Sequence, residues 1–270
     1  MAPGAAGEST AARGAGVGHT GRAWTAAGPV DAPAIVFIHG TRLSRAQWSA
    51  QVRLLAPRFR CIAVDLPGHG ALADQAFTLE AAADLVAAAI QAEAASGRAI
   101  LVGLSLGGYV AIDTAHRHPE RVAGLVLSGC SAEPTGPGAL PFLALAWVLE
   151  HVPPRPLTVA NRWYFRLRYP ARVADPIIAG GFWAAGGAQA LRALVATRFL
   201  DRAAWLWTPV LVVNGALDPV FGPGGAALAS SCRSGRHAVV RRAMHLVPLD
   251  RPRAFSRLVA RFADEVERTR

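Results

Sequence analysis

Gly103-Leu104-Ser105-Leu106-Gly107 is the stretch of this 270-residue sequence that decides its fold. An apolar run, residues 99–102, precedes it, and a helical pattern of small residues, 108–115, follows it. Strand, sharp turn and helix is the context in which a G-x-S-x-G turn presents a serine at the end of a sheet. The two glycines fit because a Cβ at either position would collide with a neighbouring strand or helix. The pattern predicts that Ser105 is a nucleophile held clear of the sheet by a strained turn.

Apolar runs and helical patterns alternate on both sides of this turn. The alternation predicts a doubly wound, mostly parallel α/β sheet. The expected strands are residues 21–27, 34–38, 61–64, 99–102, 122–127, 210–213 and 238–240. The expected helices are residues 47–56, 78–95, a helix from the serine turn to before Pro119, 222–231 and 252–266.

Residues 131–205 interrupt this alternation. They carry prolines, no strand-like run and a dense set of aromatic residues, with helical apolar spacing in 139–150 and 188–200. We interpret the segment as an inserted helical cap. The core domain is then expected to consist of residues 21–130 and 206–270.

The composition fits one large α/β domain and gives little reason to expect a nucleic-acid partner. Hydrophobic residues make up 52% of the chain, enough for a substantial core. The net charge is +10, but the basic residues are all arginine and are scattered rather than arranged in a stripe. We therefore favour a solvated surface over a polyanion site.

The cysteines and the termini predict a cytoplasmic protein. Cys61, Cys130 and Cys232 are odd in number, far apart and without metal-ligand spacing, so we expect a reduced compartment and no metal site. No stretch approaches the length of a membrane span, and the N-terminus lacks the apolar core of a signal peptide. Residues 1–20, rich in Ala, Gly, Ser and Thr, are expected to form a flexible tail.

Two further polar residues follow predicted strands in the second half of the chain. A serine needs a base to take its proton, and the base needs an acid that orients it. Asp218 comes after strand 210–213, and His245 comes after strand 238–240. Because the carboxyl ends of parallel strands meet at one edge of a sheet, Ser105, Asp218 and His245 are predicted to converge there.

Other polar residues have competing interpretations. Asp65 also ends a strand and is the alternative acid, but chain order and the distance from His245 favour Asp218. His39 is expected to orient a loop rather than to take part in the reaction. Asp113 is expected to be structural or solvated, and Asp250 is expected to be a surface residue near the start of the last helix.

Several of these residues together resemble the α/β-hydrolase family over about residues 21–268. The matching pieces are His39-Gly40, Asp65-Leu66-Pro67-Gly68-His69-Gly70, Gly103–Gly107, Asp218 and His245. The resemblance implies the α/β-hydrolase fold, a Ser-His-Asp triad and no cofactor. It also implies an oxyanion hole formed by two backbone N–H groups, which fall here on Thr41 and Leu106.

The sequence departs from the family pattern at two places. Family members usually carry two strands before the His-Gly strand, whereas one is legible here, so we expect a shortened sheet edge. Thr41-Arg42 also occupies a loop position that is often apolar. Arg42 could reach the pocket and favour an anionic group, although a solvent-pointing side chain is the favoured interpretation.

The aromatic and basic residues of the cap have two interpretations each. The aromatic side chains either pack the cap onto the sheet or line an apolar pocket over Ser105. The substrate-binding candidates among them are Trp147, Trp163 and Phe182. The cap also has an excess of arginine that could meet an acidic carrier protein or a carboxylated substrate, with a solvated face favoured. Its members are Arg155, Arg162, Arg166, Arg168 and Arg172, with Asp175 the only acidic residue in that stretch.

These features predict a serine hydrolase that cleaves an ester or lactone of a small, largely apolar substrate through an acyl-enzyme. The same triad also serves carbon–carbon bond hydrolases, acyl thioesterases and cofactor-free perhydrolases. A binding protein of the same fold is the non-catalytic alternative. The sequence leaves the natural substrate and the oligomeric state open.

Overall fold

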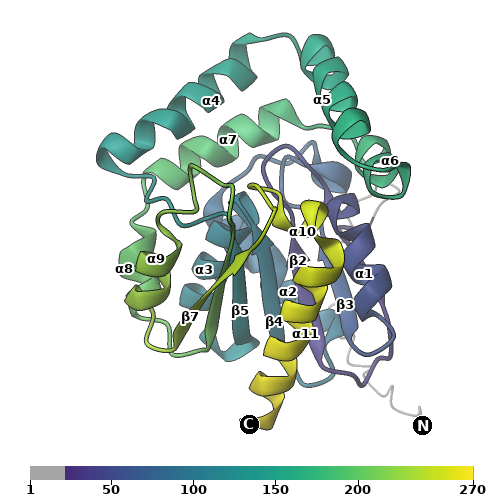
Figure 1. The fold of residues 1–270 in the computed structure, drawn as a ribbon, viewed down its shortest axis with the longest axis vertical. Coiled ribbons are helices and arrows are strands. Elements are labelled where there is room, and N and C mark those ends of the chain that lie inside the picture. The colour runs from purple at the N-terminus through teal and green to yellow at the C-terminus, as the bar shows by residue number, and fades with distance from the viewer. Residues whose placement is uncertain (1–21, 270) are drawn as a thin grey trace, which may run out of the picture.

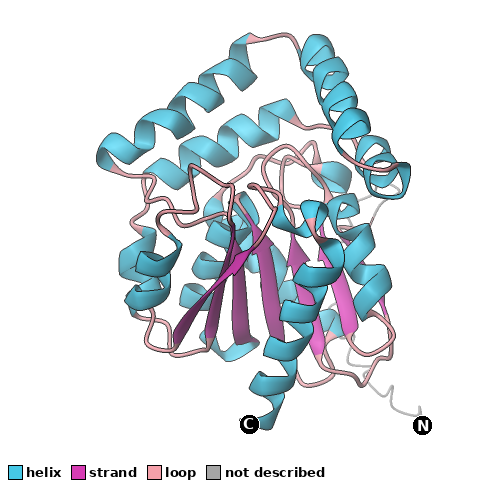
Figure 2. Cartoon of the chain, in the orientation of Figure 1, coloured by secondary structure: helices cyan, strands magenta, loops and turns pink. Residues whose placement is uncertain are grey.

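One sheet of seven strands runs through the centre of the molecule (Figure 1, Figure 2). The computed structural model describes residues 22–269. The strand order is β1-β3-β2-β4-β5-β6-β7, and every neighbouring pair is parallel except β1 with β3. The strands are β1 Trp24–Ala27, β2 Ala34–Ile38, β3 Arg60–Val64, β4 Ala99–Leu104, β5 Val122–Ser128, β6 Val210–Gly215 and β7 Gly235–Val240.

Helices cover both faces of this sheet. They are α1 Ser49–Leu55, α2 Leu79–Glu93, α3 Leu106–Arg117, α9 Gly225–Ser231, α10 Val247–Asp250 and α11 Pro252–Arg268. Alternate residues of a strand face the two layers. Val36 and Ile38 of β2 belong to the apolar cluster that includes α2 and α3, whereas Ile35 and Phe37 belong to the cluster that includes α1 and α11. Burial on both faces explains why the central strands are continuous apolar runs.

The predicted doubly wound, mostly parallel sheet is confirmed by this arrangement. Within residues 22–269, β1 is the one strand that precedes β2, and it pairs antiparallel with β3. The shortened edge stays a prediction, because the residues before position 22 lie outside the described part of the chain. The expected tail, residues 1–20, lies outside the described residues.

The segment between β5 and β6 is helical. Its helices are α4 Ala139–His151, α5 Pro154–Arg168, α6 Ala171–Ala179, α7 Ala184–Val195 and α8 Phe199–Ala204. Helices α4 to α7 lie over one end of the sheet (top of Figure 1), whereas α8 packs beside α3 and α9. The boundaries 21–130, 131–205 and 206–270 stay a prediction of the division into core and cap.

Helical spacing in the sequence indicated α4 and α7 but not α5, α6 or α8. Helix α5 begins in the proline-rich stretch Pro153-Pro154-Arg155-Pro156, a composition more typical of a loop than of a helix. Helix α6 contains Pro176, which is a poor predictor of helix because it removes a backbone donor. These helices could not be located from periodicity for that reason.

Residues 22–269 contain neither a membrane-spanning helix nor a cluster of metal-binding side chains. No helix there has the length and apolar character needed to cross a bilayer. No group of three His, Cys, Asp or Glu side chains is placed to hold a metal ion. Cys61, Cys130 and Cys232 are free and buried, and burial raises the pKa of Cys61 to about 12.

Candidate active site

Ser105 lies in the turn between β4 and α3, in a backbone conformation that L residues rarely adopt. Its φ is 53° and its ψ is −117°. The turn is fixed by a hydrogen bond from the Ser105 N–H to the Ser128 carbonyl, at 2.7 Å. A Cβ at Gly107 would collide with the Ile38 carbonyl of β2, and one at Gly103 would collide with the Gly107 carbonyl. Such strain costs about 1–3 kcal/mol and persists only where the surroundings enforce it.

Asp218 and His245 are hydrogen-bonded to each other. His245 Nδ1 lies 3.2 Å from Asp218 Oδ2, and the Asp218 side chain is only 2% exposed. The other carboxylate oxygen accepts the backbone N–H groups of Val220, at 3.0 Å, and Phe221, at 3.1 Å. Burial opposes ionisation of Asp218, but the His245 contact and these N–H donors outweigh it and lower the pKa of Asp218. The carboxylate is therefore held ionised against the imidazole.

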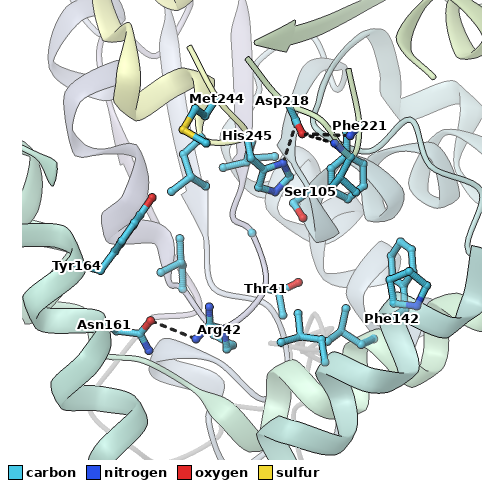
Figure 3. Close-up of a pocket in the computed structure, with 18 of the residues that line it drawn as sticks. Thr41, Arg42, Ser105, Phe142, Asn161, Tyr164, Asp218, Phe221, Met244 and His245 are labelled. Carbon is cyan, nitrogen blue, oxygen red and sulfur yellow. Dashed lines mark hydrogen bonds and ion pairs between the residues drawn. The ribbon is translucent and has the colours of Figure 1, made fainter. Parts of the chain in front are cut away.

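The imidazole of His245 faces the same space as the Ser105 side chain (Figure 3). Because the Asp218 carboxylate accepts only, Nδ1 of the neutral ring carries the proton and Nε2 is left as an acceptor. The Phe221 ring stacks on the imidazole, with centroids 4.7 Å apart. Ser105 and His245 line one cavity without a direct hydrogen bond in this structure, and such contacts are often long before substrate binds.

The loop after β2 places Thr41 beside this site. The Thr41 N–H has no acceptor among the described residues. Leu106 is the first residue of α3, where an N–H has no partner inside the helix. The neighbouring Gly40 N–H donates to Gln47 Oε1, at 2.9 Å, which fixes the loop. Two free backbone donors are thus available near Ser105, as the oxyanion-hole prediction requires.

Two buried imidazoles support the loop from below. His39 Nδ1 contacts the Gly40 carbonyl at 2.9 Å, and its Nε2 accepts the Leu66 N–H at 3.0 Å. His69 contacts the Pro67 carbonyl in the same way and accepts the Arg42 N–H at 3.3 Å. Burial lowers the pKa of His39 to about 4 and the pKa of His69 to about 3. Both rings are neutral at neutral pH and act as positioning groups.

The alternative acid, Asp65, forms its hydrogen bonds with other groups and not with His245. Its carboxylate accepts the backbone N–H groups of Arg45, at 2.7 Å, and Ala71, at 2.9 Å, and pairs with the Arg45 guanidinium. Asp65 joins two loops and does not line the cavity around Ser105. The acid that contacts His245 is Asp218.

A cavity of about 690 Å³ lies over Ser105, between the sheet edge and helices α4, α5 and α7. Its walls are mainly apolar, with a few polar groups. The lining residues are Gly40, Thr41, Arg42, Leu43, Leu104, Ser105, Pro141, Phe142, Leu145, Ala160, Asn161, Tyr164, Phe165, Leu191, Asp218, Pro219, Val220, Phe221, Met244, His245 and Leu246. Aromatic walls with few polar groups are typical of small-molecule sites.

Three predicted lining residues are absent from this wall. Trp147 is 56% exposed and Trp163 is 63% exposed, and Phe182 packs in a separate cluster, against Phe165. For Trp147 and Trp163, which lie on α4 and α5, the difference is one of rotation about the helix axis, whereas Phe182 lies in the loop between α6 and α7. On α4 the wall is formed by Phe142 and Leu145, and on α5 by residues 161, 164 and 165. The i, i+3, i+4 spacing of these residues was the available signal, but the sequence does not say which face meets the cavity.

Arg42 reaches the cavity, contrary to the favoured solvent-pointing interpretation. Its Nη1 donates to Asn161 Oδ1 of α5, at 3.2 Å (Figure 3). Asn161 belongs to no sequence motif, so no pattern pointed to it.

Asp250 is not the surface residue that was expected. Its side chain is 2% exposed and accepts the Met244 N–H at 2.7 Å. It also accepts the Tyr169 hydroxyl at 3.0 Å and pairs with Arg168 at 2.9 Å. Asp250 therefore joins the His245 loop to the end of α5.

Known proteins resemble this chain at several levels. A family model described as the alpha/beta hydrolase family matches residues 35–258. A pimeloyl-[acyl-carrier protein] methyl ester esterase of Yersinia enterocolitica is 29% identical over 259 residues, which is 90% of this chain and 97% of that protein. The enzyme of the same name from Aromatoleum aromaticum is 40% identical over 99 residues, 37% of this chain and 38% of that protein. The chain thus spans less than two fifths of the length of some curated relatives.

Solved structures agree in fold. An esterase from Thermogutta terrifontis has a TM-score of 0.75 at 25% identity, covering 90% of this chain and 93% of that one. An enol-lactonase from Burkholderia xenovorans LB400 has a TM-score of 0.75 at 24% identity, covering 88% and 95%. With the family match over most of its length, this chain belongs to the α/β hydrolase family.

Proposed function

We propose that this protein is a serine hydrolase that cleaves a carboxylic ester or a lactone. The observation that carries the proposal is the contact of His245 with the buried Asp218 carboxylate, at the edge of the cavity that Ser105 lines. The esterases among its relatives support the same class of reaction. The catalytic residues are Ser105, His245 and Asp218.

The reaction has two steps on this arrangement. Ser105 Oγ attacks the carbonyl carbon as its proton moves to His245 Nε2, and the C–O bond to the alcohol breaks as that proton passes to the leaving oxygen. Water then attacks the acyl-enzyme with His245 again as base, which releases the acid and frees Ser105. The N–H groups of Thr41 and Leu106 stabilise the oxyanion in both steps, each contributing about 3 kcal/mol.

Ser105→Ala tests the proposal. It is expected to lower kcat on a p-nitrophenyl ester by about four to six orders of magnitude and to abolish labelling by a fluorophosphonate probe. The matched control is Ser96→Ala, an exposed serine that does not line the cavity. Full turnover by the Ser105 variant would contradict a serine mechanism, and an unlabelled wild type would favour a binding protein.

A second candidate is an ester carried on an acyl carrier protein. The exposed side of α5 and α6 supports it, since Arg155, Arg162, Arg166 and Arg172 have no carboxylate within 4.0 Å among the described residues. The names of several relatives state an acyl-carrier-protein ester as substrate. A panel of free methyl esters, lactones, acyl thioesters, ring-cleavage diketones and carrier-linked esters separates this candidate from the other reactions of the same triad.

A further inference from the structure

Arg42 brings a positive charge into the wall of a mainly apolar cavity. The same cavity wall contains Leu43, Leu145 and Leu191. Its guanidinium has one hydrogen bond to a side chain, from Nη1 to the neutral amide of Asn161, and its Nε is buried without a partner. No carboxylate lies within 4.0 Å of it in the described part of the chain.

A partly buried guanidinium without a counter-charge is unfavourable. Arginine stays protonated in proteins, and a desolvated charge is costly unless an opposite charge or several acceptors face it. Burial lowers the pKa of Arg42, and no neighbouring carboxylate counteracts that effect. The N–H donors of Arg42 that have no partner in the chain are therefore suited to bind an anionic ligand.

The backbone holds Arg42 in a fixed place. Its φ is 67°, a left-handed conformation that is unusual for a residue with a long side chain. Its N–H donates to His69 Nε2 at 3.3 Å, and its carbonyl accepts the Trp183 N–H at 2.9 Å. A Cβ at Gly187 would lie 2.6 Å from Arg42 Cγ, so α7 leaves room for this side chain only by having a glycine there. A preorganised cation in a binding site loses little entropy when it meets its ligand.

We propose that the substrate carries a carboxylate, which binds the Arg42 guanidinium while the ester or lactone carbonyl faces Ser105. This inference rests on the proposed function and specifies its substrate class. Arg42 directly follows Thr41, whose N–H we assign to the oxyanion hole, so both groups belong to one loop. The competing interpretation is that Arg42 only connects this loop to α5 through its hydrogen bond to Asn161. It predicts that kcat/KM does not depend on the charge of the substrate.

The test compares esters that differ only in charge. One series pairs monomethyl esters of dicarboxylic acids, from succinic to pimelic acid, with methyl esters of alkanoic acids of the same length. A second series pairs O-acetylglycolate with propyl acetate and places the carboxylate on the alcohol side. We expect wild-type kcat/KM to favour the charged member in one series. Arg42→Met should lower that charged-to-neutral ratio by roughly 10- to 100-fold, as for loss of a charge-assisted hydrogen bond.

Two further variants keep the test decisive. Arg257→Met, an exposed arginine of α11, should leave the ratio unchanged. Asn161→Asp keeps Arg42 but supplies an internal carboxylate at the position of its present partner, so it should lower the ratio and raise Tm. The Asn161→Asp variant therefore tests the role of the Arg42 charge even if Arg42→Met folds poorly.

The outcomes separate this inference from the proposed function. If Ser105-dependent hydrolysis of neutral esters remains but neither series depends on Arg42, the carboxylate site is wrong and the hydrolase stands. Binding of monomethyl adipate to Ser105→Ala, measured by calorimetry, needs no turnover. Loss of that binding in Ser105→Ala/Arg42→Met supports the site even if the hydrolase proposal fails, and equal binding by both proteins overturns it.

Discussion

The edge of the sheet and the helices above it position their side chains in different ways. At the edge, each proposed catalytic group follows directly or closely on a strand: Ser105 on β4, Asp218 on β6 and His245 on β7. Helix α5, in contrast, buries only Phe165 and leaves Trp163 and Leu167 exposed. The pairing of the strands thus determines where the proposed catalytic side chains lie. The shape of the cavity above them depends instead on individual side-chain contacts. Substitutions in the two regions should differ in size of effect.

The largest difference is expected between two carboxylates. Asp218→Asn should lower kcat by about 10³- to 10⁴-fold, because an amide cannot balance the charge of the imidazolium or fix its tautomer. Glu150→Gln removes a carboxylate of α4 that pairs with Arg192 at the surface, and it should leave kcat within about twofold. Steady-state kinetics on one ester measures both. Similar losses in the two variants would show that the two regions do not differ as described.

The second largest effect is a pH dependence of stability, and it arises from two buried histidines at the sheet edge. The pKa of His39 is lowered from 6.5 to about 4 and that of His69 to about 3, mainly by burial. Below pH 6.5 the unfolded chain takes up protons that the folded chain excludes. With respect to these two histidines, the free energy of unfolding is therefore highest above pH 6.5. It decreases as the pH falls below 6.5, by up to about 1.4 kcal/mol per pH unit for each histidine.

Urea unfolding between pH 7.5 and 4.5 measures this slope. His69→Gln keeps an acceptor for the Arg42 N–H but cannot titrate, so its slope should be smaller than that of the wild type. His116→Gln, at an exposed site, is the matched control. A slope unaffected by His69→Gln would mean that the buried imidazoles do not govern acid sensitivity.

The smallest effect concerns the contact that joins the two regions. Tyr169→Phe removes the hydroxyl that Asp250 accepts, and should lower the free energy of unfolding by about 1–2 kcal/mol and kcat by a few fold. Burial and the Asp250 carboxylate raise the pKa of Tyr169, so the hydroxyl remains a donor across the usual pH range. Trp163→Phe on the exposed side of α5 is the control and should change neither quantity measurably. If kcat is unchanged in Tyr169→Phe while stability falls, the contact supports the fold without positioning His245.

The same contrast explains what could be predicted from the sequence. The sheet and the convergence of three loops follow from apolar runs, because strands buried on both faces leave a clear pattern. Asp250 was misjudged because its partner Tyr169 lies 81 positions away and no local pattern connects them. Trp147 and Trp163 were chosen by residue type, whereas the cavity wall depends on helix rotation, which packing decides. Family membership is established, and the roles of the site residues stay predictions.

The strand order has a consequence for how this protein comes into being. Strands β5 and β6 separate β4 from β7 in the sheet, and His245 follows β7, so it can approach Ser105 only after β7 has been synthesised and has joined the sheet. A nascent chain that ends before residue 235 already contains the serine turn, the Thr41 loop and helices α4 to α8, but no base. On the proposed function, the ribosome-bound protein has no hydrolase activity until β7 and the His245 loop have been synthesised.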